Sequence, residues 1–158
     1  MKITLNPNAK DAATRDGLVA EGGFGKYYTD HMVMCEWSEK DGWGEPHLMP
    51  YGPISLDPAT AVFHYGQEIF EGMKAYRQPD GSIALFRPTA NAKRFANSAK
   101  RLALPEMPVE LFMETIEALV TQDAGWVPSK VGESLYIRPF MIATEVGLGV
   151  RPTNKATY

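Results

Sequence analysis

Two consecutive stretches of the chain place apolar residues at the spacing of amphipathic helices. The first follows Arg87-Pro88-Thr89, where Thr89 is a candidate N-cap, and its apolar face consists of Ala92, Phe95, Ala96, Ala99 and Leu102. The second runs from about Val109 to Asp123, and its apolar face consists of Phe112, Ile116, Leu119 and Val120. The pattern predicts two helices in succession, each with one buried face.

Other stretches alternate between apolar and polar positions in the manner of β-strands. Residues 27–37 and 47–51 are two of them, and Asp41-Gly42-Trp43-Gly44 between them predicts the turn that lets them pair. Residues 134–144 form the last clear strand. Its alternation places three large side chains on one face, namely Tyr136, Arg138 and Phe140.

The stretch from His64 to Arg94 combines aromatic, glycine and basic residues most densely. Gln78-Pro79-Asp80-Gly81 predicts a turn, because Pro79 presets φ for the second turn position and the two residues after it tolerate the bend. This turn joins residues 73–76 to residues 82–86. A β-hairpin is therefore expected at the centre of the stretch.

The residues before this hairpin predict helix rather than strand. Residues 64–71 show no strict alternation, and Tyr65 and Ile69 lie four positions apart, which favours a helical turn or a short helix. Gly72 would end that turn. We expect the junction to hold Tyr65 and Phe70 rigidly beside a pocket.

Together these elements predict an α+β fold, in which the two consecutive helices pack on a largely antiparallel sheet. Residues 24–152 would form this small domain. Residues 1–23 have scattered charges and little periodicity, so we expect a loosely packed arm with at most a short helix around residues 11–18. Residues 153–158 predict the start of another strand or of an interdomain connection.

Composition and charge narrow the class of protein. The 158 residues are 44% hydrophobic and 22% charged, which is ordinary for one globular domain. The net charge of -3 gives no reason to expect a nucleic-acid or anionic-membrane partner, because both need clustered Lys and Arg. No signal peptide or membrane-spanning stretch is expected, because no long apolar run occurs.

The cysteine and histidine residues predict neither a disulfide nor a metal site. Cys35 is the only cysteine, which excludes an intrachain disulfide and a cysteine-based zinc site. His31, His47 and His64 lack the spacing of metal ligands. We expect a reducing, cytoplasmic compartment.

Several motifs resemble those of the branched-chain amino acid aminotransferases, which belong to the fold-type IV class of enzymes that use pyridoxal 5'-phosphate (PLP). They occur in order along most of the chain: Phe24 to Met32, His64 to Arg77, Leu85 to Pro88, Asn91 to Arg94, Ser134 to Pro139 and Gly147 to Val150. The resemblance implies the fold of the small N-terminal domain of these enzymes, with PLP as cofactor. D-amino acid transaminases and aminodeoxychorismate lyases share the class, but residues 67–75 and 136–138 resemble the branched-chain group better.

The resemblance implies roles for two arginines. Arg94 matches the arginine that binds the cofactor phosphate, and a guanidinium presents a fork of donors that suits phosphate oxygens. From the residues alone, Arg94 also fits a solvated helix face. Arg138, with Tyr136, matches a pair that faces the substrate pocket, where the arginine recognises the distal carboxylate of glutamate. From the residues alone, Arg138 fits a structural salt bridge to a glutamate equally well.

The resemblance also implies apolar walls for a pocket that accepts Leu, Ile and Val. Phe24, Tyr65 and Phe70 would form them, although plain core packing explains large aromatics as well. Leu148 and Val150 match a loop that reaches the active site of the neighbouring subunit, so a homodimer is expected. The glycines of this loop also fit a simple turn.

The implied reaction moves the amino group of Leu, Ile or Val to 2-oxoglutarate, giving a 2-oxo acid and glutamate. In the family, the lysine that forms the Schiff base with PLP lies in a second domain, before a Gly-Gly-Asn-Tyr motif that is absent here. We therefore expect an N-terminal domain or truncated fragment that is inactive alone and does not hold PLP stably. Glu68 and Glu71 are given no catalytic role, because that lysine transfers the proton. The alternative is a stand-alone binding module without catalysis.

Overall fold

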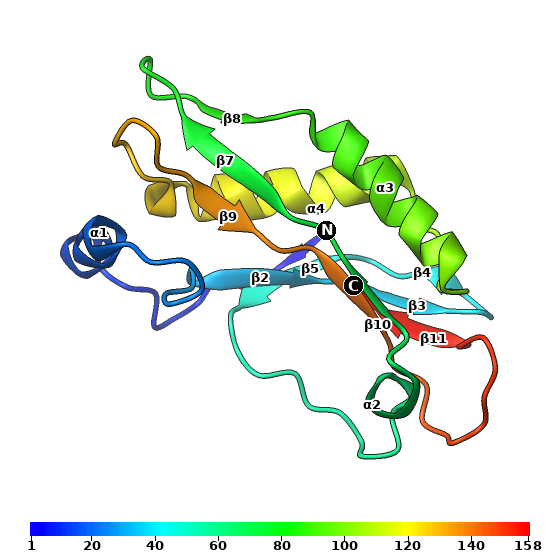
Figure 1. The fold of residues 1–158 in the computed structure, drawn as a ribbon. Coiled ribbons are helices and arrows are strands. Elements are labelled where there is room, and N and C mark those ends of the chain that lie inside the picture. Colours follow the sequence, from blue (N-terminus) through cyan, green and yellow to red (C-terminus); the bar gives the residue numbers. More distant parts are fainter.

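Three β-sheets and two long helices make up the computed structural model, which describes residues 1–158 (Figure 1). The helices are α1 (Ala12–Glu21), α2 (Ala61–Tyr65), α3 (Pro88–Arg101) and α4 (Val109–Gln122), followed by the short 3-10 helix η1 (Ala124–Trp126). The strands are β1 (Lys2–Ile3), β2 (His31–Met34), β3 (Glu36–Ser38), β4 (Gly42–Trp43), β5 (His47–Pro50), β6 (Glu68–Phe70), β7 (Met73–Arg77), β8 (Ile83–Leu85), β9 (Leu135–Ile137), β10 (Phe140–Ala143) and β11 (Lys155–Thr157). None of the helices has the length and apolar character needed to cross a membrane.

The sheets are antiparallel except for one pair of strands. The largest has the order β4-β3-β11-β10-β6, and the others are β8-β7-β9 and β1-β5-β2, in which β1 and β5 run parallel. The long helices α3 and α4 lie above β2, β3, β5 and β11 in Figure 1, whereas β7 and β8 are drawn at or above their height. The predicted α+β fold is therefore confirmed, and so is the hairpin, which β7 and β8 form.

The core lies where α3 and α4 face the five-stranded sheet. Phe95 of α3 and Phe112 of α4 are fully buried, with ring centroids 5.4 Å apart. The ring of Tyr158 lies 5.6 Å from that of Phe95, edge to face, and its hydroxyl is 2.9 Å from the Thr115 hydroxyl. The apolar faces predicted for the two helices thus meet the sheet at β11.

Two stretches that were each predicted as one strand are interrupted in the structure. The strand predicted over residues 27–37 is interrupted at Cys35. Before Cys35, β2 pairs with β5, and after it, β3 pairs with β11. At Cys35 the backbone exchanges two hydrogen bonds with Tyr158, of 3.0 and 2.9 Å. Residues 134–144 divide before β10 at Pro139, which has no N–H to continue the ladder.

The helical turn predicted over residues 64–71 is wrong. Helix α2 ends at Tyr65, because Gly66 adopts a left-handed φ of 57° and donates its N–H to the carbonyl of Val62. The following residues form β6, whose alternation buries Ile69 and exposes the residues on either side. Gly66, and not Gly72, is the glycine that terminates the helix.

Two details at the ends of α3 also differ from the sequence prediction. The helix begins two residues earlier than it would with Thr89 as N-cap: Arg87 is the N-cap, and Pro88 occupies the first turn, where its missing N–H costs nothing. Leu102 lies beyond the last helical residue and is exposed, so it is not part of the buried face.

The first 23 residues are held more firmly than predicted. Strand β1 pairs with β5, and Asp11 caps a helix that extends to Glu21. The backbone N–H of Asn6 donates to Nε2 of His31 at 2.9 Å, which ties the segment to β2. At the other end of the chain, residues 153–158 contain the predicted strand, β11, and the interdomain connection stays a prediction.

Candidate functional site

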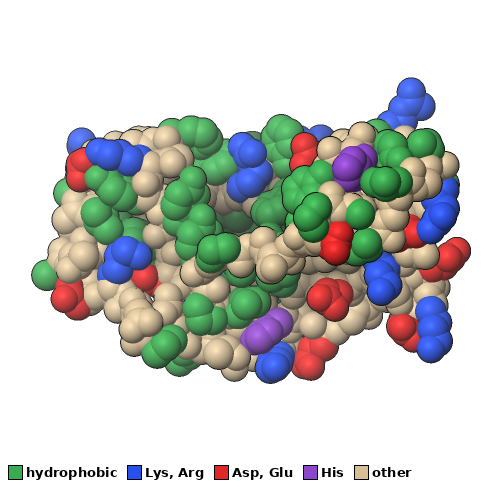
Figure 2. All heavy atoms as spheres, turned by 90° about the horizontal axis from the view of Figure 1, so that it is seen from below, with side chains coloured by type: hydrophobic (Ala, Val, Ile, Leu, Met, Phe, Trp, Pro, Cys, Tyr) green, Lys and Arg blue, Asp and Glu red, His purple; other side chains and the backbone are tan.

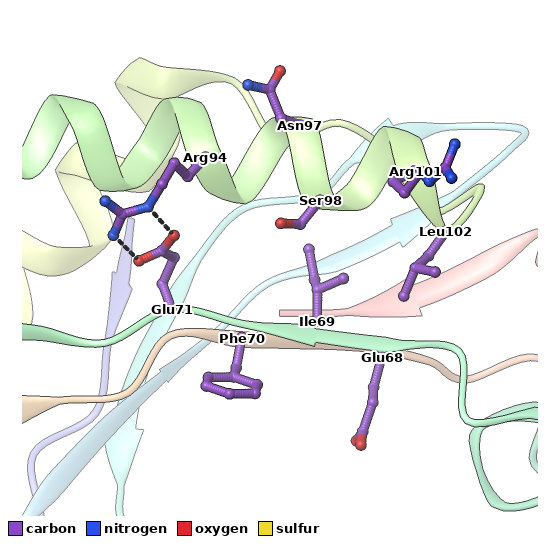
Figure 3. Close-up of a pocket in the computed structure, with 9 residues that line it drawn as sticks. All are labelled: Glu68, Ile69, Phe70, Glu71, Arg94, Asn97, Ser98, Arg101 and Leu102. Carbon is purple, nitrogen blue, oxygen red and sulfur yellow. Dashed lines mark hydrogen bonds and ion pairs between the residues drawn. The ribbon is translucent and has the colours of Figure 1, made fainter.

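Arg94 projects from α3 toward the residue that follows β6, Glu71 (Figure 3). Its Nε donates to Oε1 of Glu71 at 2.9 Å, and its Nη2 donates to Oε2 at 2.8 Å. This side-on pair uses two of the five N–H donors that a guanidinium carries. The Arg94 side chain is still 63% exposed, so its other edge remains open to a ligand.

Glu71 is buried and has two further connections. Nδ2 of Asn91, one turn before Arg94 on α3, donates to Oε2 of Glu71 at 2.9 Å. The backbone N–H of Glu71 donates to the carbonyl of Pro139 at 2.8 Å. Burial opposes ionisation of Glu71, but the hydrogen bonds from Arg94 and Asn91 outweigh it and hold the pKa of the carboxyl below its usual value. Glu71 is therefore a fixed anion beneath Arg94.

An open hollow of about 620 Å³ lies between α3 and β6. Figure 3 shows that Ile69 and Glu71 point from the strand toward α3, whereas Glu68 and Phe70 point away. The α3 side of the hollow is lined by donors, namely Arg94, Asn97, Ser98 and Arg101. Such a set fits a phosphate group. No lysine lines the hollow.

Four of the predicted site residues form one cluster around Arg138. Nε and Nη2 of Arg138 donate to the Tyr136 hydroxyl at 3.1 and 2.9 Å, and the guanidinium carbon lies 4.5 Å above the Phe70 ring. The ring of Phe24 contacts that of Tyr136 edge to face, with centroids 4.8 Å apart. Arg138 forms no salt bridge with a carboxylate, contrary to the structural alternative.

Gly72 connects this cluster to the pair of Glu71 and Arg94. A Cβ built on Gly72 would stand 2.5 Å from the hydroxyl of Tyr136, so only glycine lets that hydroxyl approach. Nδ2 of Asn91 also contacts the carbonyl of Gly72, at 3.2 Å. The backbone of residues 71–72 thus joins the α3 side of β6 to the side that carries Arg138.

The remaining predicted residues form a second group. The hydroxyl of Tyr65, in α2, donates to the carbonyl of Leu148 in the loop after β10. Leu148 is exposed and Val150 is 84% exposed. No hydrogen bond or ring contact joins this group to Arg138 or Arg94. Seen from below, the molecule has hydrophobic side chains around a central hollow, with basic side chains near it (Figure 2).

The exposure of the aromatic residues contradicts the alternative of plain core packing. Phe24, Tyr65 and Phe70 all lie at the surface. Three residues of the site were missed from the sequence: Glu71 as the partner of Arg94, together with Asn91 and Gly72. The three-residue spacing of Asn91 and Arg94 was a usable signal, since it places both on one helix face. Glu71 could not be recognised as that partner, because the sequence pattern of residues 64–71 favours a helix.

The known proteins that are similar in sequence or structure are named as branched-chain amino acid aminotransferases. A protein of Streptomyces coelicolor named "Probable branched-chain-amino-acid aminotransferase" is 58% identical over 159 residues, covering 99% of this chain and 44% of the relative. The branched-chain amino acid aminotransferase of Escherichia coli matches the fold with a TM-score of 0.60 at 21% identity, over 80% of this chain and 38% of that one. The enzyme of the same name from T.th., complexed with N-(5'-phosphopyridoxyl)-L-glutamate, matches with a TM-score of 0.57 at 27% identity, over 78% and 38%.

These matches differ in how much of each protein they involve. Nearly the whole of this chain is matched, but it spans only about two fifths of the length of the curated relatives. No family model matches the chain. The names of the relatives agree with the branched-chain motifs and not with the other activities of the fold-type IV class.

Proposed function

The chain belongs to the branched-chain aminotransferase family and corresponds to the N-terminal domain of these proteins, and from this we propose its part in catalysis. It supplies the substrate pocket and the phosphate-binding arginine of an enzyme that moves the amino group of Leu, Ile or Val to 2-oxoglutarate. In this proposal Arg94 binds the cofactor phosphate. The substrate-binding residues are Phe24, Tyr65, Phe70, Tyr136, Arg138, Leu148 and Val150.

The observation that carries the proposal is the environment of Arg138. A cation without a carboxylate partner is held above Phe70 and hydrogen-bonded to Tyr136, on a surface of exposed aromatics. Such a surface suits aliphatic side chains, while the guanidinium suits the distal carboxylate of glutamate. One pocket therefore accepts both substrates of the reaction, because the cation is paired only when glutamate or 2-oxoglutarate is bound.

The residues around Arg94 fit the phosphate of PLP. Arg94 keeps N–H donors beyond those that Glu71 occupies, and Ser98 and Asn97 line the same hollow. In this proposal these side chains bind and orient the phosphate. When bound, PLP would supply the electron sink for transfer of the amino group.

The proton-transferring lysine is proposed to lie outside these 158 residues. None of the nine lysines lines the hollow next to Arg94. The chain alone would then bind PLP weakly and would not catalyse transamination. Its own residues would hold the substrate carboxylate and the cofactor phosphate, but would not move a proton at the reacting carbon.

Leu148 and Val150 support a homodimer as part of the proposal. Both side chains are apolar and exposed, although the backbone of their loop is bonded to Tyr65 of α2. Packing this loop against a second copy would remove the apolar surface from water. The single cysteine, Cys35, is buried as a free thiol, which fits the reducing conditions of the cytoplasm, where we place the enzyme.

Joining the chain to the remaining part of the Streptomyces coelicolor relative gives a protein in which the reaction itself is measurable. We expect leucine-dependent production of glutamate from 2-oxoglutarate. Arg138→Gln should raise KM for 2-oxoglutarate by about tenfold or more, with a small effect on KM for leucine. Lys130→Gln, which changes a distant exposed cation, is the matched control. Equal effects of Arg138→Gln on both substrates would contradict the assignment.

Borohydride reduction tests the location of the lysine. The 158-residue chain is mixed with PLP, reduced and analysed by intact mass. We expect no single stoichiometric adduct and no transaminase activity. One adduct at a defined lysine, together with activity, would show that the chain contains its own reactive lysine and would refute this part of the proposal.

A further inference from the structure

We propose that Glu71 is a positioning residue, which sets the direction in which Arg94 presents its remaining N–H donors to a phosphate group. This inference rests on the proposed phosphate-binding role of Arg94 and assigns a function to a carboxylate that the sequence left without one. It also explains why a buried anion stands next to an arginine that is proposed to bind an anion.

The geometry of the pair leaves the useful edge of the guanidinium free. Glu71 accepts from Nε and Nη2, along the side of the guanidinium plane. Both N–H groups of Nη1 and the second N–H of Nη2 are not used by Glu71. These three donors point away from the carboxylate. A phosphate can therefore be bound by the end of the guanidinium while its side remains paired.

Glu71 is itself immobilised, which makes it an effective anchor. Its side chain is buried, receives a hydrogen bond from Asn91, and belongs to a residue whose backbone is bonded to Pro139. Arg94 by contrast is largely exposed and has a long side chain that loses conformational entropy when it is fixed. Fixing it before the ligand arrives removes that cost from binding.

The same contacts connect Arg94 to Arg138. Glu71 and Gly72 are consecutive, Gly72 accommodates the hydroxyl of Tyr136, and that hydroxyl accepts two hydrogen bonds from Arg138. Pro139, whose carbonyl accepts from Glu71, follows Arg138 directly. The two arginines are thus held through one short run of backbone, so that a cofactor phosphate and a substrate carboxylate are placed in a fixed relation.

Glu71 could also act on phosphate binding in the opposite direction, because its negative charge repels a bound phosphate. If the charge of Glu71 mattered more than its geometry, Glu71→Gln would strengthen phosphate binding, and Glu71→Asp would leave it unchanged. Positioning predicts that both variants weaken binding. Glutamine turns an amide N–H toward a guanidinium N–H, and aspartate withdraws the carboxylate by one methylene. The two variants therefore separate the two explanations by the sign of the effect.

The test measures binding of pyridoxamine 5'-phosphate, which has no aldehyde to react with lysines, by isothermal titration calorimetry. The protein is the chain joined to the remaining part of the Streptomyces coelicolor relative, because the chain alone is expected to bind the cofactor weakly. Pyridoxamine, titrated in the same way, gives the background without phosphate. We expect Arg94→Lys, Glu71→Gln and Glu71→Asp each to lower the phosphate-dependent affinity by about tenfold. Glu117→Gln, which changes an exposed carboxylate of α4 outside the hollow, should change it less than about twofold.

A second readout reports the orientation of Arg94 without any ligand. In ¹⁵N-labelled chain, the Nε–H signal of Arg94, assigned by its loss in Arg94→Lys, should exchange slowly with water because Glu71 accepts from it. Glu71→Gln should accelerate this exchange, and Glu68→Gln should not. Asn91→Ser keeps the carboxylate and loosens it, so an intermediate loss of affinity is expected even if Glu71→Gln folds poorly.

The outcomes distinguish this inference from the proposed function. If Arg94→Lys weakens phosphate binding but both Glu71 variants bind as well as the unchanged chain, or more tightly, then Glu71 does not position Arg94 and the proposed function stands. If Arg94→Lys has no effect, or the joined protein without substitutions shows no phosphate-dependent binding, the phosphate role of Arg94 fails, and this inference fails with it.

Discussion

The hydroxyl of Tyr136 lies 2.5 Å from the position that a Cβ of Gly72 would occupy. This distance is shorter than any ordinary contact between carbon and oxygen. The close approach of these two residues determines where the hydroxyl stands, and the hydroxyl in turn holds Arg138 through two hydrogen bonds.

Gly72→Ala should therefore displace the Tyr136 ring and release Arg138. We expect a loss of about 1 kcal/mol in the free energy of unfolding, at the low end for overpacking because the ring is only half-buried. Chemical denaturation measures this loss, and the exchange rate of the Arg138 Nε–H signal measures the release. Gly52→Ala, which has no atom within 4 Å of the added Cβ, is the control. Unchanged Arg138 exchange in Gly72→Ala would contradict the argument.

Phe95→Ala should be among the most damaging substitutions in the core. Phe95 is fully buried and touches the rings of Phe112 and Tyr158, so truncation leaves a cavity between α3, α4 and β11. We expect a loss of about 3 to 5 kcal/mol in the free energy of unfolding. Phe86→Ala removes an equally large but exposed ring and should cost less than about 0.5 kcal/mol. Similar losses in the two variants would refute this description of the core.

The stability that Glu71 contributes should depend on pH. The pKa of Glu71 is lowered in the folded state, so its contribution is fully present above the ordinary value of 4.5. It is lost as the pH falls through the lowered folded-state pKa. The difference in the free energy of unfolding between the unchanged chain and Glu71→Gln should accordingly be constant near neutrality and shrink below pH 4.5. The control is Glu68→Gln, which removes an exposed carboxylate without a bonded partner. A difference that grows on acidification would have the wrong sign.

Cys35 should be unreactive in the folded protein. Burial raises the pKa of its thiol to about 11, so the thiolate is scarce at neutral pH and the sulfur is shielded from reagents. We expect a colorimetric thiol reagent to react slowly with the native chain and at the normal rate in denaturant. Rapid stoichiometric labelling of the native chain would show that the junction between β2 and β3 opens readily.

The sequence predicted the elements whose signal is local. The periodicity around Phe95 and Phe112 was sufficient for α3 and α4, and the turn at Pro79 was sufficient for the hairpin. Prediction from the sequence failed where the structure of a segment depends on which sheet the strand joins. Nothing near Cys35 indicates that its backbone will pair with Tyr158, because the two residues are distant in the sequence.

For the site as well, the sequence identified residues but not how they are paired in space. Motif resemblance proposed Arg94, Arg138 and Tyr136 as site residues, and the structure gives each a defined partner. The pairing of Arg94 with Glu71 could not be predicted, because it depends on Glu71 facing α3. That orientation follows from strand β6, whose residues have a sequence pattern that favours a helix.

Strand β11 is the shared neighbour of β3 and β10. During synthesis on the ribosome, β3 emerges together with its hairpin partner β4 but long before β10 and β11. The edge of β3 that faces β11 stays unpaired until residues 155–157 have been made. Contacts this distant in sequence form slowly. The nascent chain is therefore exposed to misassociation while residues 39–154 are made, and the five-stranded sheet is completed only after β11 has been synthesised.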